Sequence, residues 1–373
     1  MTRVAHLTSV HPVDDARILT KECGSLAAAG YEVYLIAPGK ERELAAGVHL
    51  VPVAMPRGRL ERATRTAWSV FRATMRTRAT VCHFHDPELI PIGILLKLAG
   101  RRVIYDVHED LPRQIRDKVW IHPILRAPMA GLASMAEFVA GQIFDAIVTV
   151  TPTIAARFPR SSTVMVRNLP ILDELVPTVR TRTYRERALV AVYVGGIAAT
   201  RGARQLVAAM DLVGRRSAAR LVLAGRFQPE GLEGELSGRP GWDHVDVVGW
   251  LGRTAVAELL GTARIGLVTL LPTSSYRDSY PTKLFEYMAA GLPVIASDFP
   301  LWRGIVETAG CGLLVDPTDP AAIAAAIERL LDDPAEAEAM GLRGQRAIIQ
   351  HYSWEAERAV LLDLYARLAR SVA

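Results

Sequence analysis

Apolar residues follow two alternating patterns along almost the whole chain. Short runs dense in Val, Ile and Leu alternate with longer stretches in which apolar residues recur every three or four positions. The first pattern is typical of strands buried on both faces of a parallel sheet, and the second of amphipathic helices. In the first half these patterns predict strands at 3–9, 31–37, 48–54, 80–85, 102–107, 145–150 and 163–167, and helices at 14–29, 60–79, 86–99, 121–142 and 152–158.

The alternation is interrupted at residues 168–188, where Pro177 and a charged stretch predict an interdomain linker. We therefore expect an α/β protein with two Rossmann-like, doubly wound parallel-sheet domains, residues 1–185 and 186–352, and a last helix at 353–373 that packs back on the first domain. The second half predicts strands at 189–194, 219–224, 244–248, 264–270, 293–296 and 312–315, and helices at 201–214, 254–262, 281–290, 300–307, 319–332, 335–350 and 353–371.

Composition narrows the class of protein. The 373 residues carry a net charge of +5, which favours anionic partners such as phosphates. The three cysteines are far apart and without metal-ligand spacing, which indicates free thiols in a reducing cytosol. The N-terminus leads directly into a strand pattern and no apolar run reaches about 18 residues, so we expect a cytoplasmic protein with no signal peptide and no membrane span.

The most informative stretch is residues 278–297, which read DSYPTKLFEYMAAGLPVIAS. Pro281 suits the first turn of a helix, and Gly291 followed by Pro293 marks its end. The free N–H groups at such a helix start can bind a diphosphate, and Lys283 in the first turn would add a cation. Ordinary helix capping with a solvated Glu286 would explain the same residues, and this segment alone leaves both interpretations open.

The order of the whole segment resembles the donor site of retaining glycosyltransferases of the GT-B fold, in the large family-4-like group. In that family two domains face each other across a cleft, and a glutamate, seven further residues and a second glutamate precede Ala-x-Gly-x-Pro-Val; this sequence has Asp278, one methylene shorter, at the first position. Glu286 matches the glutamate that holds the ribose, and Asp278 takes the place of the acidic residue that contacts the donor sugar. The resemblance implies that the donor is bound by Pro281, Thr282, Lys283, Leu284 and Glu286.

Three further stretches resemble the family in the expected order. Residues 193–202 match its phosphate loop, with Gly195 and Gly196 at the turn and Arg201 in place of the phosphate-binding lysine. Gly196 replaces a family arginine, and Lys283 could supply the missing cation. Residues 221–226, ending in Arg226, match the next strand and turn. Residues 245–251 match the segment that holds the base, which implies contacts at Trp250 and Leu251.

Polar residues also follow strands of the first half. His108, after the strand at 102–107, lies where the family places a histidine beside the donor sugar. Glu109 and His85 lie on the same rim, and we expect at most one of His83 and His85 to face the cleft. Asp14 and Arg17 follow the first strand and are predicted on the acceptor side, with a helix cap and a solvated first turn as the alternative.

The resemblance implies transfer of a sugar from a nucleoside diphosphate to a hydroxyl with retention at the anomeric carbon. Uracil is the expected base, with guanine and thymine open, and the acceptor would be a glycan, a lipid-linked or a small molecule. It implies no metal ion and no cofactor besides the donor. A sugar-nucleotide epimerase of the same fold and a non-catalytic sugar-binding protein are the alternatives. No G-x-G-x-x-G follows the first strand, which argues against a nicotinamide enzyme.

Residues 57–78 contain seven arginines interleaved with Leu60, Trp68, Phe71 and Met75. This pattern fits a helix whose apolar stripe faces the core, or a surface for anionic lipid at the inner membrane face. We expect no nucleic-acid partner, because no zinc finger, helix-turn-helix or aromatic-basic platform is present in the sequence.

Overall fold

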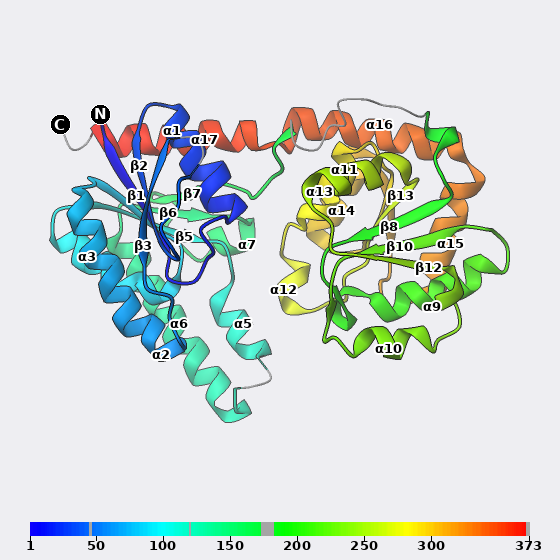
Figure 1. Ribbon diagram of the computed structural model, residues 1–373, viewed down its shortest axis with the longest axis horizontal. Helices are drawn as coiled ribbons and strands as arrows, with labels where there is room; N and C mark the ends of the chain where they lie inside the picture. Colours follow the sequence, from blue (N-terminus) through cyan, green and yellow to red (C-terminus); the bar gives the residue numbers. More distant parts are fainter. Residues whose placement is uncertain (45–46, 119–120, 173–182, 371–373) are drawn as a thin grey trace. The chain divides into compact units, whose positions relative to one another are not determined.

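The structure is a computed structural model that describes residues 1–44, 47–118, 121–172 and 183–370. Contacts divide the chain into unit 1, Met1–Asn168 with Trp354–Ala373, and unit 2, Leu169–Ser353 (Figure 1). Part of the predicted linker, 173–182, lies outside the described residues. The domain limits expected at residues 185 and 352 therefore stay predictions.

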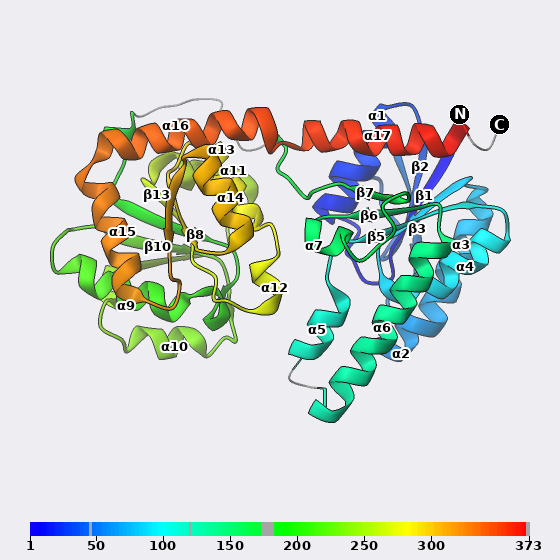
Figure 2. The same ribbon diagram turned by 180° about the vertical axis from the view of Figure 1, so that it is seen from behind.

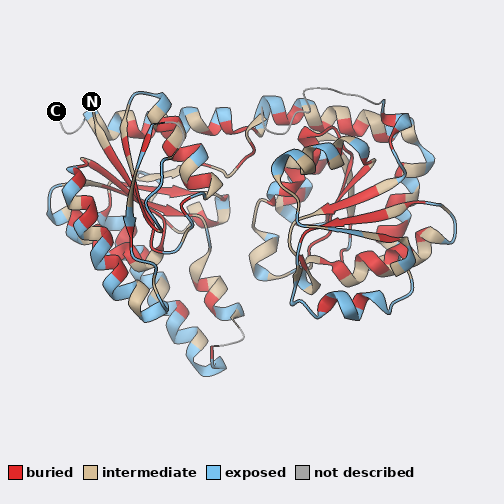
Figure 3. Ribbon diagram, in the orientation of Figure 1, coloured by how far each residue is buried: buried red, intermediate tan, exposed pale blue. Residues whose placement is uncertain are grey.

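Unit 1 is built on a seven-stranded sheet in the order β3-β2-β1-β4-β5-β6-β7, and every pairing is parallel. Parallel strands need helical crossovers, so both faces become covered, and the strands are dense in Val and Ile. Figure 3 shows these strands largely buried. The strands are β1 Arg3–Leu7, β2 Glu32–Pro38, β3 Val48–Val53, β4 Val81–Phe84, β5 Arg102–Val107, β6 Ala146–Thr149 and β7 Thr163–Met165.

The unit 1 helices are η1 Ala16–Cys23, α1 Gly24–Ala28, α2 Arg59–Glu61, η2 Arg62–Thr66, α3 Ala67–Thr77, η3 Pro87–Leu89, α4 Ile90–Leu98, α5 Leu111–Asp117, α6 Pro123–Ile143, α7 Pro152–Ala155 and α17 Trp354–Arg370. Buried residues of α3, α4 and α6 share one core with the strands. The last helix, α17, contacts η1, α1 and β7. Trp354 Nε1 donates to Ser25 Oγ at 3.0 Å, and Arg167 donates to Glu357. These bonds hold α17 against α1 and against the segment that follows β7.

Unit 2 repeats this architecture with a six-stranded parallel sheet in the order β12-β10-β8-β13-β14-β15, beside a small sheet of β9 and β11. Its strands are β8 Val190–Val194, β9 Ile197–Ala198, β10 Arg220–Ala224, β11 Phe227–Gln228, β12 Val245–Gly249, β13 Ile265–Val268, β14 Val294–Ser297 and β15 Gly312–Val315. Its helices are η4 Tyr184–Glu186, η5 Ala199–Arg201, α9 Ala203–Gly214, α10 Leu232–Ser237, η6 Trp242–His244, α11 Arg253–Thr262, α12 Ser274–Arg277, α13 Thr282–Ala289, α14 Pro300–Ala309, α15 Pro320–Asp332 and α16 Pro334–His351.

The prediction of two Rossmann-like parallel-sheet domains is confirmed. The missed elements, such as α5, α10 and α12, are four to seven residues long, too short for a helical period to stand out. The expectation that the apolar stripe of residues 57–78 faces the core is wrong in part. Leu60 is 80% and Trp68 51% exposed, because the smaller Ala67, Val70 and Ala73 face the core instead.

Helix α6, in front in Figure 2, exposes apolar side chains along its outer face, among them Ile124, Leu132, Met135 and Phe138. None of the helices in the described part of the chain combines the length and apolarity needed to cross a membrane.

Candidate functional site

Helix α13 of unit 2 carries the stretch that the sequence singled out. Pro281 takes the N-cap position, with φ −76° and ψ 116°, so the helix starts at Thr282, one residue later than predicted. The helix ends before Gly291, whose φ of +69° is the left-handed conformation that glycine tolerates. The first N–H groups of α13 have no partner within the helix, as at any helix start. They lie beside Lys283, the second residue of the helix.

The Lys283 side chain is buried and points at the end of β8. Its Nζ donates a hydrogen bond to the Tyr193 hydroxyl at 2.9 Å and lies 4.1 Å from the centre of the Tyr193 ring. Burial, and after it the positive charge of Arg201, lower the pKa of Lys283 to about 7. A lysine in this state gains its full charge when an anion comes next to it.

Arg201 approaches the same point from η5. Its Nη1 donates to the Gly196 carbonyl at 3.4 Å. A Cβ built on Gly196 would lie 3.2 Å from Arg201 Nη1, and one built on Gly195 would lie 3.3 Å from Lys283 Nζ. The charge of Glu286 attracts Lys283, but less strongly than burial and Arg201 act against its charge. Two cations therefore converge over a backbone turn without side chains, which leaves room for an anion.

The two glycine turns of unit 2 touch each other. Gly195 has a φ of +118°, and a Cβ on Gly225 would overlap the Gly195 carbonyl oxygen. Beyond Gly225 lies a hollow of about 570 Å³, lined among others by Arg226, Gln228 and Trp250. Trp250 is 68% exposed, so its ring is available for stacking. Leu251 follows it and is half-buried.

Asp278 and Glu286 are both partly exposed. Asp278 ends helix α12, and Glu286 lies in the second turn of α13. Leu284, between Lys283 and Glu286, is fully buried in the unit 2 core, so only its backbone faces a ligand. The contacts of the two carboxylates with a sugar and a ribose stay predictions.

Unit 1 has a pocket of about 290 Å³ at the carboxyl ends of its strands. His85, Asp86, His108, Glu109 and Lys118 are among the residues that line it. They follow strands β4 and β5, whose carboxyl ends meet at one edge of the sheet. The predicted residues His85, His108 and Glu109 are therefore brought together at one pocket.

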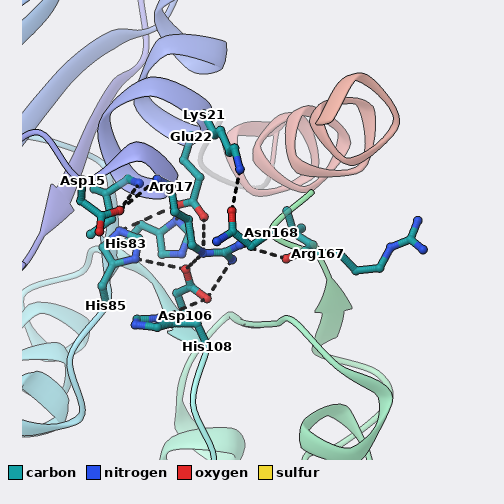
Figure 4. A network of polar contacts seen from close by, with 12 residues as sticks. Asp15, Arg17, Lys21, Glu22, His83, His85, Asp106, His108, Arg167 and Asn168 are labelled. Atoms are coloured by element: carbon teal, nitrogen blue, oxygen red, sulfur yellow. Dashed lines mark hydrogen bonds and ion pairs between the residues drawn. The ribbon is translucent and has the colours of Figure 1, made fainter. Parts of the chain in front are cut away.

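A buried ion pair lies below this pocket (Figure 4). Arg17 donates from Nε to Asp106 Oδ2 at 3.0 Å and from Nη2 to Asp106 Oδ1 at 3.1 Å, and its Nη1 donates to the Val166 carbonyl at 3.2 Å. Burial alone would favour the neutral acid, but Arg17 and a hydrogen bond with His85 hold the pKa of Asp106 well below its usual range. His85 Nδ1 lies 3.1 Å from Asp106 Oδ2, so the ionised carboxylate orients the His85 ring.

The structure corrects two expectations on this rim. Arg17 is only 6% exposed, so a solvated first turn is wrong, and its predicted acceptor contact stays untested. Asp15, not Asp14, caps η1, by accepting from the N–H groups of Arg17 and Ile18. Of His83 and His85, only His85 lines the pocket, in line with the expectation that at most one of them faces the cleft. Their rings nevertheless belong to one buried cluster, with centres 4.8 Å apart, because residues two apart along a strand share a face.

Sequence reasoning also missed His6 and Glu22, which are fully buried in this cluster. His6 pairs in register with His83 on the neighbouring parallel strand. His6 and His83 are polar residues in otherwise apolar strands, and this was the signal in the sequence that could have revealed the cluster. On the unit 2 side, the Tyr193 hydroxyl was missed as the partner of Lys283.

Comparison with known proteins identifies the class of protein to which this chain belongs. The family "Glycosyltransferase Family 4" matches residues 16–162, and the family "Glycosyl transferases group 1" matches residues 180–347. The chain belongs to these glycosyltransferases, which have the GT-B fold.

Individual relatives agree with this family. The MMP alpha-(1->4)-mannosyltransferase of Mycolicibacterium hassiacum is 25% identical over 299 residues, which cover 78% of this chain and 71% of that enzyme. Sucrose-phosphate synthase from Thermosynechococcus elongatus has a similar structure, with a TM-score of 0.79, 22% identity and all of both chains covered. The HepE protein of Anabaena in complex with UDP-glucose has a TM-score of 0.73 at 13% identity, over 98% of this chain and 100% of HepE.

Proposed function

We propose that this glycosyltransferase moves a hexose from a nucleoside diphosphate, with UDP as the carrier, to a hydroxyl group with retention of configuration. The observation that carries the proposal is the meeting of Lys283 and Arg201 over the Gly195–Gly196 turn, beside the start of α13. A diphosphate would satisfy both cations and the free N–H groups together.

The same arrangement suits the chemistry of the leaving group. When the sugar departs, negative charge builds on the diphosphate, and preorganised donors stabilise that charge best in a site with little water. Lys283, Arg201 and the α13 N–H groups are such donors, and we propose that they act without a metal ion. The departing phosphate takes the proton of the acceptor hydroxyl, so no separate base is needed.

We assign the rest of the donor by position. The base lies in the hollow at Arg226 and Trp250, and main-chain groups at Trp250 and Leu251 hold its edge. Glu286 accepts hydrogen bonds from the ribose. Asp278 and His108 orient the sugar, and we assign Asp14, Arg17, His85 and Glu109 to the acceptor side. The mannosyl transfer named for the M. hassiacum relative and the UDP-glucose bound to HepE support a hexose and a uridine carrier.

Product analysis tests the reaction against its alternatives. The protein is incubated with UDP-glucose or GDP-mannose and a panel of glycan, small-molecule and lipid-linked alcohols, and the sugar is followed by ¹H NMR. A new glycoside with the anomeric configuration of the donor supports the proposal. An altered nucleotide sugar would indicate the epimerase, and binding without turnover on every alcohol would indicate a sugar-binding protein.

We further propose that unit 1 contacts anionic membrane surfaces through residues 57–78, at the cytoplasmic side. Leu60 and Trp68 are exposed there, as are Arg65 and Arg72. Apolar side chains that enter the lipid interface beside arginines are typical of such surfaces.

A further inference from the structure

Four metal-ligating side chains meet inside unit 1, beneath the pocket. They are His6 on β1, Glu22 on η1, His83 on β4 and His85 just after β4, and all are buried. Each offers one ligand atom, and these atoms lie within 4.8 Å of one another. Figure 4 shows Glu22 beside His83 and His85.

The Glu22 carboxylate lies among the imidazole nitrogens without bonding to them. Its Oε2 is 3.6 Å from His6 Nδ1, 3.8 Å from His85 Nε2 and 4.0 Å from His83 Nδ1, all beyond hydrogen-bond length. Neither Glu22 oxygen has a hydrogen-bond donor in the described part of the chain, and the same holds for His83 Nε2. A buried carboxylate oxygen without a partner costs several kcal/mol.

The neighbouring cation does not neutralise the Glu22 carboxylate. Arg17 lies 3.1 Å from Glu22 Oε1, but it makes its two hydrogen bonds to Asp106, whose charge it neutralises. Burial raises the pKa of Glu22 well above its usual range, so an uncompensated negative charge is disfavoured where Glu22 faces three imidazoles. It needs a proton or a cation at the centre of the cluster.

We propose that this cluster binds a divalent transition metal ion, and that the ion is zinc. Three imidazoles and one carboxylate form a ligand set typical of tetrahedral zinc. Bonds of about 2.0–2.2 Å place neighbouring tetrahedral ligand atoms roughly 3.3 Å apart. His6 Nδ1 and His85 Nε2 are 3.1 Å apart and joined by a hydrogen bond that the ion would replace. Glu22 Oε2 lies 3.6, 3.8 and 4.0 Å from the three histidines, so these ligand atoms would have to move somewhat closer around the ion.

The surroundings match the second layer of a zinc site. His85 directs its other nitrogen, Nδ1, at Asp106, as in the carboxylate–histidine–zinc arrangement. The Tyr365 hydroxyl on α17 lies 3.0 Å from the second nitrogen of His6, Nε2, and 2.9 Å from His83 Nδ1. The ligands also come from β1, β4 and a π-helical stretch at η1, a backbone form that occurs often at functional sites.

The ion would be structural and take no part in the transfer step itself, although its ligand His85 belongs to the acceptor side proposed above. It would join two strands to η1, and its ligand His85 also lines the pocket, so the metal would fix the pocket wall. This inference does not rest on the proposed reaction.

Metal analysis of untagged protein grown with added zinc tests the proposal. We expect about one zinc per chain, and visible absorption bands of tetrahedral Co²⁺ when the metal is replaced. His83→Ala and Glu22→Gln should lose the metal and the bands. The exposed His49→Gln should keep both. Tyr365→Phe, which removes a partner of His6, should weaken Co²⁺ binding by about 10–100-fold.

The thermal midpoint gives an independent measurement. A strong chelator should lower it in the wild type and leave it unchanged in Glu22→Gln. Wild-type protein that is free of metal, does not bind Co²⁺ and keeps its midpoint with Zn²⁺ or chelator would overturn the proposal. Glu22 would then hold a proton, and Glu22→Gln, which imitates the protonated acid, would be as stable as the wild type.

Discussion

The Lys283 ammonium donates a hydrogen bond of 2.9 Å to the Tyr193 hydroxyl and lies 4.1 Å from the centre of the same ring. The hydroxyl and the ring of Tyr193 are both uncharged, so the Lys283 ammonium has an attractive π-face but no buried counter-ion there. Burial and the charge of Arg201 lower the pKa of Lys283 to about 7. A diphosphate that binds beside it must raise this pKa again.

The affinity for a nucleotide sugar should therefore depend on pH through Lys283. Below pH 7 the lysine is already charged, and binding needs no proton. Above the free-state pKa of about 7 binding must take up a proton, so the affinity should fall by up to tenfold per pH unit until the pKa of the complex is reached. Calorimetry with UDP-glucose between pH 6 and 9 measures this, because the charge of its diphosphate does not change over that range.

Two variants serve as controls for this pH dependence. Lys283→Arg keeps the charge at every pH and should bind with a flat profile. Lys283→Met should bind more weakly with a flat profile. A wild-type affinity that stays constant across pH 7 would mean that Lys283 does not contact the phosphate.

Gly195→Ala should abolish donor binding but lower the free energy of unfolding only moderately. At φ +118° a side chain is strained, by roughly 1–3 kcal/mol, and the new Cβ would lie 3.3 Å from Lys283 Nζ. The exposed helical Gly234 has nothing within 4 Å of a built Cβ, so Gly234→Ala is the control and should raise stability by about 0.5–1 kcal/mol. Urea unfolding and UDP titration measure both effects, and unchanged UDP binding in Gly195→Ala would remove the turn from the donor site.

Arg17→Met should destabilise unit 1 by about 3–5 kcal/mol, because it leaves Asp106 as a buried carboxylate without its cation. The neighbouring Asp14 is exposed, and Asp14→Ala should change stability by no more than about 0.5 kcal/mol. Chemical unfolding of both variants measures these two changes in stability. A fully stable Arg17→Met would show that this ion pair does not hold Asp106 in place.

The order of strands and helices could be predicted because buried strands and amphipathic helices differ in period. The turn at Gly195 and Gly196 could be singled out only through the resemblance to the family, whereas Lys283 stands at a helix start that Pro281 marks in the sequence. The hydrogen bond between Lys283 and Tyr193 could not be predicted, since it joins residues 90 positions apart. The burial of Arg17 could not be predicted, because its partner Asp106 lies 89 positions away, on β5.

The membrane contact of residues 57–78 predicts a change in Trp68 fluorescence. Trp68 is 51% exposed, and its emission should shift to the blue with anionic vesicles but not with zwitterionic ones. Each arginine near an anionic surface contributes about 1 kcal/mol, so Arg65→Ala with Arg72→Ala should weaken binding roughly 30-fold.

Controls separate this surface from general basicity. Arg215→Ala with Arg216→Ala removes two exposed arginines of unit 2 and should leave vesicle binding unchanged. Trp68→Phe should remove the shift. Equal losses in both arginine pairs would mean that vesicles respond only to net charge.

Calorimetric titration of UDP, GDP, dTDP and, as a control, NAD tests the central claim, that unit 2 binds a nucleoside diphosphate. We predict that one diphosphate, UDP, binds saturably, and that Glu286→Ala, which removes a charged acceptor of ribose hydrogen bonds, weakens it by about tenfold or more. The exposed Glu355→Ala should bind like the wild type. A well-folded protein that binds none of the three diphosphates would contradict the account.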